Sequence, residues 1–331
     1  MNMYTTLKTL CLCPSVSGRE AAVREKIEAM IRPWCDECYT DTLGNLIARK
    51  KGNGKKIMLA AHMDEIGFLV NTIEENGMIR VAPVGGISFA AAAFCPVVSE
   101  KGVKGAIVPN GKTKPEDYKA DAFYIDIGAT SKKKAEAKVS VGDFFVLTPK
   151  LERISGGRVC GRPLDDRVGC AILLDVAERL WNEKTDADVY YVFSVQEEVG
   201  CRGSKTAAFA IAPDFGLCFD VTGTGDVPGA SPMACSLGGG AAVKIKDASV
   251  ICDEGVVKEL CRLAEKNKIK YQKEILLYGG TDTSSMQMSG SGAAAGALSI
   301  PSRYIHSGSE VCDLADVEAC ASLAVEFVKS I

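Results

Sequence analysis

The fold class can be predicted from one stretch of the chain, residues 168–198, with the sequence VGCAILLDVAERLWNEKTDADVYYVFSVQEE. The apolar spacing over 168–181 predicts a helix, and the continuous apolar run over 188–195 predicts a buried strand. A helix followed directly by a buried strand is typical of a sheet that helices cover. We therefore expect an α/β protein whose mainly parallel sheet is covered by helices on both faces.

The same alternation extends in both directions from this stretch. Towards the N-terminus, the first 30 residues predict a helix, because Val23, Ile27 and Met30 recur at helical spacing after a cap signal at 17–20. The other expected elements are strands at 45–48 and 56–61, a helix at 204–210, a strand at 215–219, a helix at 255–266, a strand at 293–300 and a final helix at 316–330.

The sequence changes in character between residues 70 and 162. Short apolar runs alternate there with Gly, Pro and Lys turns, which predicts a barrel or sandwich of strands with one short helix at 131–139. We therefore divide the chain into a discontinuous α/β domain, residues 1–69 and 163–331, and an inserted β-rich domain, residues 70–162. The strands expected in the insert are 79–81, 103–108, 123–127 and 144–147.

The composition excludes several classes of function. The 331 residues carry 39 Lys and Arg against 42 Asp and Glu, and this balance argues against nucleic acid as a partner because phosphate binding needs a basic surface. No apolar stretch approaches the roughly 18 residues of a membrane span, and the N-terminus lacks the apolar core of a signal peptide. We therefore expect a cytoplasmic protein without a membrane partner. Its 14 cysteines should be reduced, and the single CxxC pair, Cys35 and Cys38, is a weak zinc signal.

Candidate metal ligands follow four of the expected strands. The chain has only two histidines, and both lie at such positions. Because ligands bind beyond the carboxyl ends of the strands in open α/β sheets, these side chains are placed to converge. The candidates are His62, Asp64 and Glu65 after the strand at 56–61, Glu197 and Glu198 after 188–195, Asp220 after 215–219, His306 beyond 293–300, and the pair Asp165–Asp166 before the helix at 168–181.

Each candidate taken alone has an ordinary structural explanation. Glu197 and Glu198 could begin a helix, where the helix dipole favours acids, and Asp165–Asp166 could be a helix cap. Asp220 could begin a turn. Taken together, five acid or histidine sites at strand ends, including both imidazoles, favour a metal centre.

The types of candidate ligand indicate which metals could bind and what chemistry they could supply. Two imidazoles with several carboxylates and no cysteine suit Zn, Co or Mn, and one carboxylate can bridge two ions that hold a hydroxide and polarise a carbonyl. His62 and Asp64 share a face if the strand continues, so Asp64 can orient the imidazole. Glu197 and Glu198 point to opposite sides of an extended backbone, so one can bind metal while the other moves a proton.

Six motifs, in order along the chain, resemble those of the M42 family of metallo-aminopeptidases. The fold of that family is an α/β catalytic domain with an inserted β-barrel-like dimerisation domain, which agrees with the change of character between residues 70 and 162. The motifs are AHMDEIGF at 61–68, LDDRVG at 164–169, QEEVGCRG at 196–203, DVT at 220–222, GGTD at 279–282 and IPSRYIHS at 300–307.

The resemblance implies a role for each candidate residue. Glu197 would be the general base, Asp64 would orient His62, and the peptide bond between Asp165 and Asp166 would be cis. The subunit would bind two divalent metal ions, Zn or Co, with Mn as a further choice. The implied ligands are His62 and Asp220 for one ion, Glu198 and His306 for the other, and Asp165 as the bridge.

The leading prediction is therefore a hydrolase that removes N-terminal residues from short peptides. A glycoside hydrolase that uses Glu197 with another carboxylate is a second possibility, but it has no need for two histidines at strand ends. A non-catalytic scaffold on the same fold is a third, although such a protein would not need all five ligands.

The resemblance also implies a homo-oligomer. Dimers formed through residues 70–162 would build a dodecameric tetrahedral shell with the active sites inside. A closed shell of this kind needs a second contact patch on the catalytic domain. Its pores would admit short, unfolded peptides and exclude folded proteins.

Overall fold

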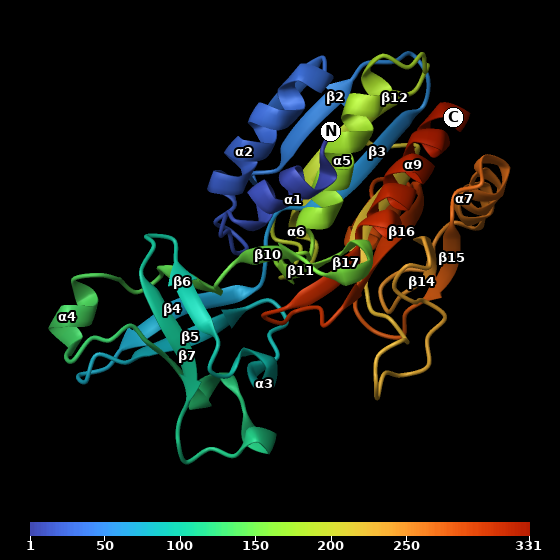
Figure 1. The fold of residues 1–331 in the computed structure, drawn as a ribbon. Coiled ribbons are helices and arrows are strands. Elements are labelled where there is room, and N and C mark those ends of the chain that lie inside the picture. The colour runs from blue at the N-terminus through green and yellow to red at the C-terminus, as the bar shows by residue number, and fades with distance from the viewer.

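The structure is a computed structural model that describes all residues 1–331. Figure 1 shows a layered α/β part that contains both termini and a smaller part, built of strands, that projects from it. The larger part is built on an 11-stranded sheet and the smaller part is a closed barrel. The predicted α/β fold with a barrel-like insert is therefore confirmed.

The large sheet is parallel at its centre and antiparallel on both sides, rather than mainly parallel throughout. Its four central strands pair in parallel in the order β12 (Asp188–Ser194), β3 (Lys56–His62), β13 (Phe215–Thr222) and β16 (Ala294–Arg303). The antiparallel flanks are β2 (Leu46–Lys50) and β1 (Glu37–Thr40) beyond β12, and β17 (Glu310–Asp313), β11 (Arg158–Arg162) and β10 (Lys150–Arg153) beyond β16. A side branch is formed by β14 (Ala241–Lys246), which pairs with β16 and with β15 (Tyr271–Ile275).

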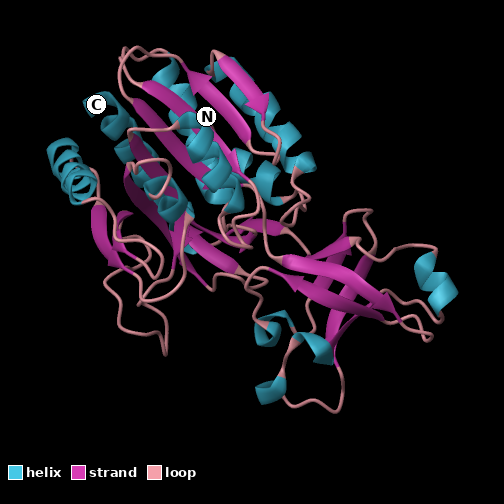
Figure 2. Cartoon of the chain, turned by 180° about the vertical axis from the view of Figure 1, so that it is seen from behind, coloured by secondary structure: helices cyan, strands magenta, loops and turns pink.

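Helices cover both faces of this sheet, as predicted (Figures 1 and 2). One face carries a core of 50 buried residues and the other a smaller core of 12. Because both faces are covered, every residue of β12 is buried. The first face is covered by α1 (Met3–Cys11), α2 (Ala21–Ile31), α5 (Arg167–Trp181), α7 (Glu254–Asn267) and α9 (Leu314–Ser330), and the second by α6 (Arg202–Ile211) and α8 (Asp282–Gln287).

The barrel has its own core, in which Phe68, Phe123 and Phe145 are fully buried. The short helix expected at 131–139 is present as α4 (Lys132–Glu136), and α3 (Phe89–Ala92) lies between two barrel strands in the chain. In order around the barrel, the strands are β4 (Gly67–Ile73), β5 (Ile79–Val84), β8 (Phe123–Asp126), β7 (Lys104–Pro109), β6 (Pro96–Ser99) and β9 (Phe144–Leu147).

The chain returns to the large sheet earlier than the predicted boundary at residue 162. The barrel ends with β9, whereas β10 and β11 belong to the large sheet, where β11 pairs with β17. Short strands with polar turns look alike in either sheet, so the sequence pattern did not separate them. This pairing matters for the site, because β11 ends only three residues before Asp165.

The first 30 residues form two helices instead of one. Pro14 and Gly18 lie between α1 and α2, and Gly18 has a left-handed φ of 80°. Proline disfavours a helical conformation in the residue before it, and a left-handed glycine ends helical continuity. Residues 17–20, where a cap was expected, directly precede α2, but the N-cap residue Glu20 makes no side-chain capping hydrogen bond with it.

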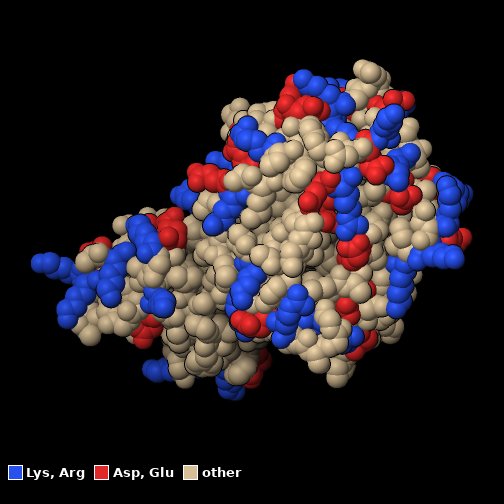
Figure 3. Space-filling model, turned by 45° about the horizontal axis from the view of Figure 1, so that its top comes forward, with Lys and Arg blue, Asp and Glu red and all other residues tan.

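Figure 3 shows one face of the molecule, and this face has no continuous basic band. Over the α/β part, basic side chains (Lys, Arg) and acidic side chains (Asp, Glu) are interspersed. Basic side chains gather at the far end of the barrel part, the end at which α4 lies in Figure 1. None of the helices combines the length and apolarity needed to cross a lipid bilayer.

Candidate metal centre

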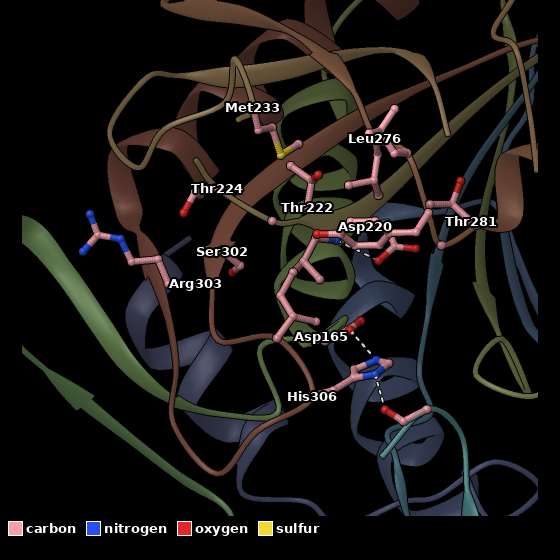
Figure 4. Close-up of a pocket in the computed structure, with 18 of the residues that line it drawn as sticks. Asp165, Asp220, Thr222, Thr224, Met233, Leu276, Thr281, Ser302, Arg303 and His306 are labelled. Atoms are coloured by element: carbon pink, nitrogen blue, oxygen red, sulfur yellow. Dashed lines mark hydrogen bonds and ion pairs between the residues drawn. The ribbon is translucent and has the colours of Figure 1, made fainter. Parts of the chain in front are cut away.

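The carboxyl ends of the central strands meet at one edge of the sheet, as predicted. His62 ends β3 and is paired in register with Ser194, the last residue of β12. Asp220 lies near the end of β13, and the loop after β16 brings His306 to the same edge. Asp165 joins them from the segment between β11 and α5 (Figure 4). The structure thus brings together side chains from well-separated parts of the chain.

Asp165 lies between the two imidazoles. Its Oδ1 is 3.1 Å from Nε2 of His62, and its Oδ2 is 3.1 Å from Nε2 of His306. Each imidazole faces one further carboxylate: Asp220 Oδ1 is 3.9 Å from Nε2 of His62, and Glu198 Oε2 is 3.3 Å from Nε2 of His306. The five side chains therefore form two halves that share Asp165.

Nε2 of His62 faces the carboxylates because Nδ1 donates a hydrogen bond to the backbone carbonyl of Asp64, at 3.1 Å. The carboxylate of Asp64, which the sequence suggested as this partner, is farther away at 3.5 Å. It accepts hydrogen bonds from the backbone N–H groups of Glu197 (3.0 Å) and Glu198 (3.2 Å) and from the hydroxyl of Ser17 (2.6 Å). Asp64 thus contacts the imidazole through its carbonyl and orders the acidic pair through its carboxylate.

His306 is held in the same way, by a residue that the sequence did not indicate. Its Nδ1 donates to the carbonyl oxygen of Gly86 at 2.7 Å, and its backbone N–H donates to Oε1 of Glu310 at 3.2 Å. The other oxygen of Glu310 accepts from the N–H groups of Leu164 (2.5 Å) and Asp165 (3.2 Å). Glu310 therefore fixes two proposed ligands at once. It is a single acid at the first position of the short strand β17, so it gave no sequence signal.

The acidic pair lies at the beginning of a turn and not on extended backbone. β12 ends at Ser194, and Glu198 is the first residue of the turn. The two side chains line one cavity instead of opposite sides of a strand. Glu198 faces His306 and its Oε1 is buried without a hydrogen-bond partner, whereas Glu197 accepts a hydrogen bond from the thiol of Cys201 at 3.1 Å. The two acids are distinguished by their partners.

Two further buried acids support the frame of the site. Asp166 caps α5, which is the role that the sequence left open for the Asp165–Asp166 pair, and the peptide bond between these two residues is cis. Asp282, the last residue of the GGTD motif, accepts hydrogen bonds from the hydroxyls of Ser194 and Ser204, both at 2.5 Å. These bonds link β12, α6 and α8 behind the cavity.

The site concentrates carboxyl groups in a buried place. Burial raises the pKa of Glu197 and that of Asp220 well above their usual values. Burial alone would lower the pKa of His306, but hydrogen bonds with Asp165 and Glu198 raise it to about 12. No lysine lines the cavity with these carboxylates. The surplus of acid favours the binding of cations.

The donor set fits divalent metal ions. Ligands about 2.05 Å from a tetrahedral ion lie about 3.3 Å from each other, and the four imidazole–carboxylate separations are 3.1, 3.1, 3.3 and 3.9 Å. Donor atoms of His62, Asp165 and Glu198 lie within 4.8 Å of one another. The unpartnered buried Oε1 of Glu198 also suits a ligand. All 14 cysteines are free, and Cys35 and Cys38 belong to none of the clusters that could hold a metal.

The proposed ligands line one side of a cavity of about 880 Å³. Its remaining walls come from the segments that follow β13 and β15 and from the residues just before His306. Figure 4 shows Met233 and Leu276 on the side of Asp220 that is remote from His306. The cavity therefore extends from the ligands towards an apolar wall.

Known proteins resemble this chain in both sequence and structure. The model of the M42 glutamyl aminopeptidase family matches residues 44–323. A protein of Acetivibrio thermocellus named as a candidate aminopeptidase is 44% identical over 330 residues, which cover 99% of this chain and 98% of that protein. The aminopeptidase APDkam598 from the archaeon Desulfurococcus kamchatkensis has a TM-score of 0.95 and 37% identity, covering 99% of this chain and 95% of its own. The Pyrococcus horikoshii TET1 peptidase, which can assemble into a tetrahedron or a large octahedral shell, has a TM-score of 0.90 and 31% identity over 100% of both chains.

The similarity extends over the whole chain, including the barrel and the strands that carry the candidate ligands. The resemblance seen in the six motifs is thereby confirmed, and with it the prediction of a hydrolase of the metallo-aminopeptidase class. Divalent metal ions are the cofactors that this class implies, in agreement with the donor set. The chain belongs to the M42 family of metal-dependent aminopeptidases.

Proposed function

We propose that this aminopeptidase removes N-terminal residues from short peptides with two divalent ions per subunit. When bound, two such ions polarise the scissile carbonyl and increase the acidity of a water molecule. The observation that carries the proposal is the position of Asp165, whose two oxygens each lie 3.1 Å from a different imidazole. The proposed ligands are His62 and Asp220 for one ion, Glu198 and His306 for the other, and Asp165 for both.

Glu197 is the proposed general base. It lines the cavity next to Glu198, but its Oε1 faces the thiol of Cys201 instead of an imidazole, so it is not needed as a ligand. Its carboxylate takes a proton from the attacking water and later delivers it to the nitrogen of the leaving peptide.

Asp64 is proposed as a positioning residue. Its carbonyl accepts the Nδ1 proton of His62 and so leaves Nε2 free for metal. Its carboxylate holds the backbone N–H groups of Glu197 and Glu198, so the base and a ligand are fixed by one side chain. Loss of this carboxylate would therefore displace both acids.

Zn or Co are the proposed metals, with Mn as a further choice, because imidazole and carboxylate ligands without cysteine suit all three. A panel of aminoacyl p-nitroanilides, assayed after chelation and reloading with each metal, tests the function. Release of p-nitroaniline with at least one metal is the expected result. No release from any substrate with any of the three would contradict the proposed function.

A homo-oligomer is proposed for the assembly, with dimers joined through the barrel and a dodecameric shell as the complete form. The support is the similarity to the P. horikoshii peptidase, which forms closed shells. Light scattering on the intact chain should give a mass close to twelve copies of the 35.1 kDa chain. A monomer that digests folded proteins would contradict both the assembly and restricted access.

A further inference from the structure

We infer that the cavity accepts a neutral, apolar side chain from the N-terminal residue of the peptide, and that the mutual pairing of Arg303 and Asp226 leaves no partner for a charged one. The inference rests on the proposed aminopeptidase function and narrows its substrate class. It separates this chain from enzymes that select an acidic or a basic N-terminal residue.

The charged groups of the cavity wall fall into two sets. The first set surrounds the metal centre and is used there. Outside it, Arg303 is the only Lys, Arg, Asp or Glu among the residues that line the cavity. The first set consists of Asp165, Glu197, Glu198, Asp220 and His306.

The charge of Arg303 is already compensated. Its Nε donates to Oδ1 of Asp226 at 3.2 Å and its Nη2 donates to Oδ2 at 2.6 Å, so the guanidinium and the carboxylate form a two-point ion pair. The side chains are 21% and 27% exposed, respectively. A substrate carboxylate would have to displace Asp226 to reach Arg303, and a substrate ammonium group would have to displace Arg303 to reach Asp226.

Part of the cavity wall outside the metal centre is apolar. It includes Val227 and Met233 from the segment after β13, and Ile275, Leu277 and Tyr278 from the end of β15 and the loop that follows. Leu277 and Tyr278 are 75% and 63% exposed, which is unusual for large apolar side chains in a cavity wall. An apolar side chain in contact with them would remove apolar surface from water on both partners.

The apolar residues line the same cavity as the metal centre, which favours the substrate as their partner. A Cβ placed on Gly223 would lie 3.7 Å from the hydroxyl of Tyr278, so the loop after β15 approaches the segment that follows Asp220 closely. A peptide whose first carbonyl lies at the metal centre would therefore place its first side chain near this loop. A glutamate or lysine side chain there would lose hydration without gaining a partner.

Rates with the intact, metal-loaded enzyme on leucyl, methionyl, glutamyl and lysyl p-nitroanilides test the inference. We expect kcat/KM for the leucyl and methionyl substrates to exceed those for the glutamyl and lysyl substrates by about tenfold or more. A glutamyl or lysyl rate equal to the leucyl rate would overturn the inference while leaving the aminopeptidase function intact. Absence of cleavage of all four substrates would contradict the proposed function itself.

Variants of the ion pair test its role separately. Asp226→Asn frees the guanidinium and should raise the glutamyl-to-leucyl ratio of kcat/KM about threefold, and Arg303→Gln frees the carboxylate and should raise the lysyl-to-leucyl ratio similarly. Glu259→Gln is the matched control, because it breaks the exposed ion pair with Arg262 on α7, away from the cavity. Ratios that stay at the wild-type value in both ion-pair variants would overturn the role of the pair.

Tyr278→Ser distinguishes the substrate from a second copy of the chain as the occupant of the apolar wall. We expect KM for the leucyl substrate to rise while the mass from light scattering stays unchanged. A changed mass with an unchanged KM would show that the wall is covered by another subunit, and would overturn the inference.

Discussion

His306 donates a hydrogen bond from Nδ1 to the carbonyl oxygen of Gly86, a residue 220 positions earlier in the chain. Gly86 lies between β5 of the barrel and the short helix α3, whereas His306 follows β16 of the large sheet. The barrel segment therefore helps to orient an imidazole of the metal centre. The insert has a role in the site as well as its proposed role in assembly.

Gly86→Val is expected to lower metal occupancy. A Cβ at this position would lie 3.2 Å from Nδ1 of His306, and a branched side chain would push the imidazole away from Glu198 and Asp165. Metal analysis after dialysis should show less than two ions per chain. Gly111→Val is the control, because a Cβ on Gly111 meets nothing within 4 Å. Equal metal content in the two variants would contradict the orienting role of Gly86.

Glu197→Gln is expected to lower kcat by about 10²-fold or more while metal content stays near the wild-type value, because the amide cannot carry the proton. Glu198→Gln should instead lose metal, since its carboxylate faces His306. Metal analysis and rates on one aminoacyl substrate decide between the two roles. If Glu197→Gln lost metal but regained activity on reloading, the assignments of base and ligand would be reversed.

His62→Ala and His306→Ala are each expected to lower metal occupancy, because each removes the only imidazole of its half of the site. The double variant should bind metal weakly at both positions. Cys35→Ala serves as a control that removes a possible ligand outside the centre. Two tightly bound ions in the double histidine variant would remove the metal centre proposed for this edge of the sheet.

Asp226→Asn should change the pH dependence of stability in acid. Its hydrogen bonds with Arg303 lower the pKa of Asp226 from 3.8 to about 2. A lowered folded-state pKa means that the ionised carboxylate stabilises the folded protein above pH 4, and that this contribution is lost as the pH falls towards 2. The difference in unfolding free energy between wild type and variant should be below about 1 kcal/mol at pH 6, since the pair is partly exposed.

Urea unfolding of both proteins at several pH values measures this difference. It should be constant from about pH 5 to 7 and shrink between about pH 4 and 2. A difference that grows as the pH falls would contradict the assignment.

The sequence predicted the parts of the site that depend on local pattern. Apolar strands that run into His62 and Asp220 could be recognised because a buried central strand has few polar residues. The family resemblance then supplied the pairing of ligands, and the geometry around Asp165 is compatible with it.

The parts that could not be predicted depend on long-range pairing or on unusual backbone conformation. The contact between Gly86 and His306 joins the barrel to the sheet, and nothing near either residue indicates it. Gln196 has a left-handed φ of 57°, which leads the chain into a turn and brings Glu197 and Glu198 to one cavity. The strand β15 was missed because only one of its five residues is buried, so its pattern is mostly polar. The cytoplasmic location and the choice of metal stay predictions.

Metal titration into chelated protein, followed by the rate of leucyl p-nitroanilide cleavage, tests the central claim most directly. The account predicts no turnover without metal and a rate that rises until two ions are bound per chain, because each imidazole and its carboxylate complete one half of the site around Asp165. A glycoside hydrolase or a scaffold would show no such metal-dependent peptidase activity. A rate that is unchanged in metal-free protein, or that is complete with one ion per chain, would contradict the two-ion account.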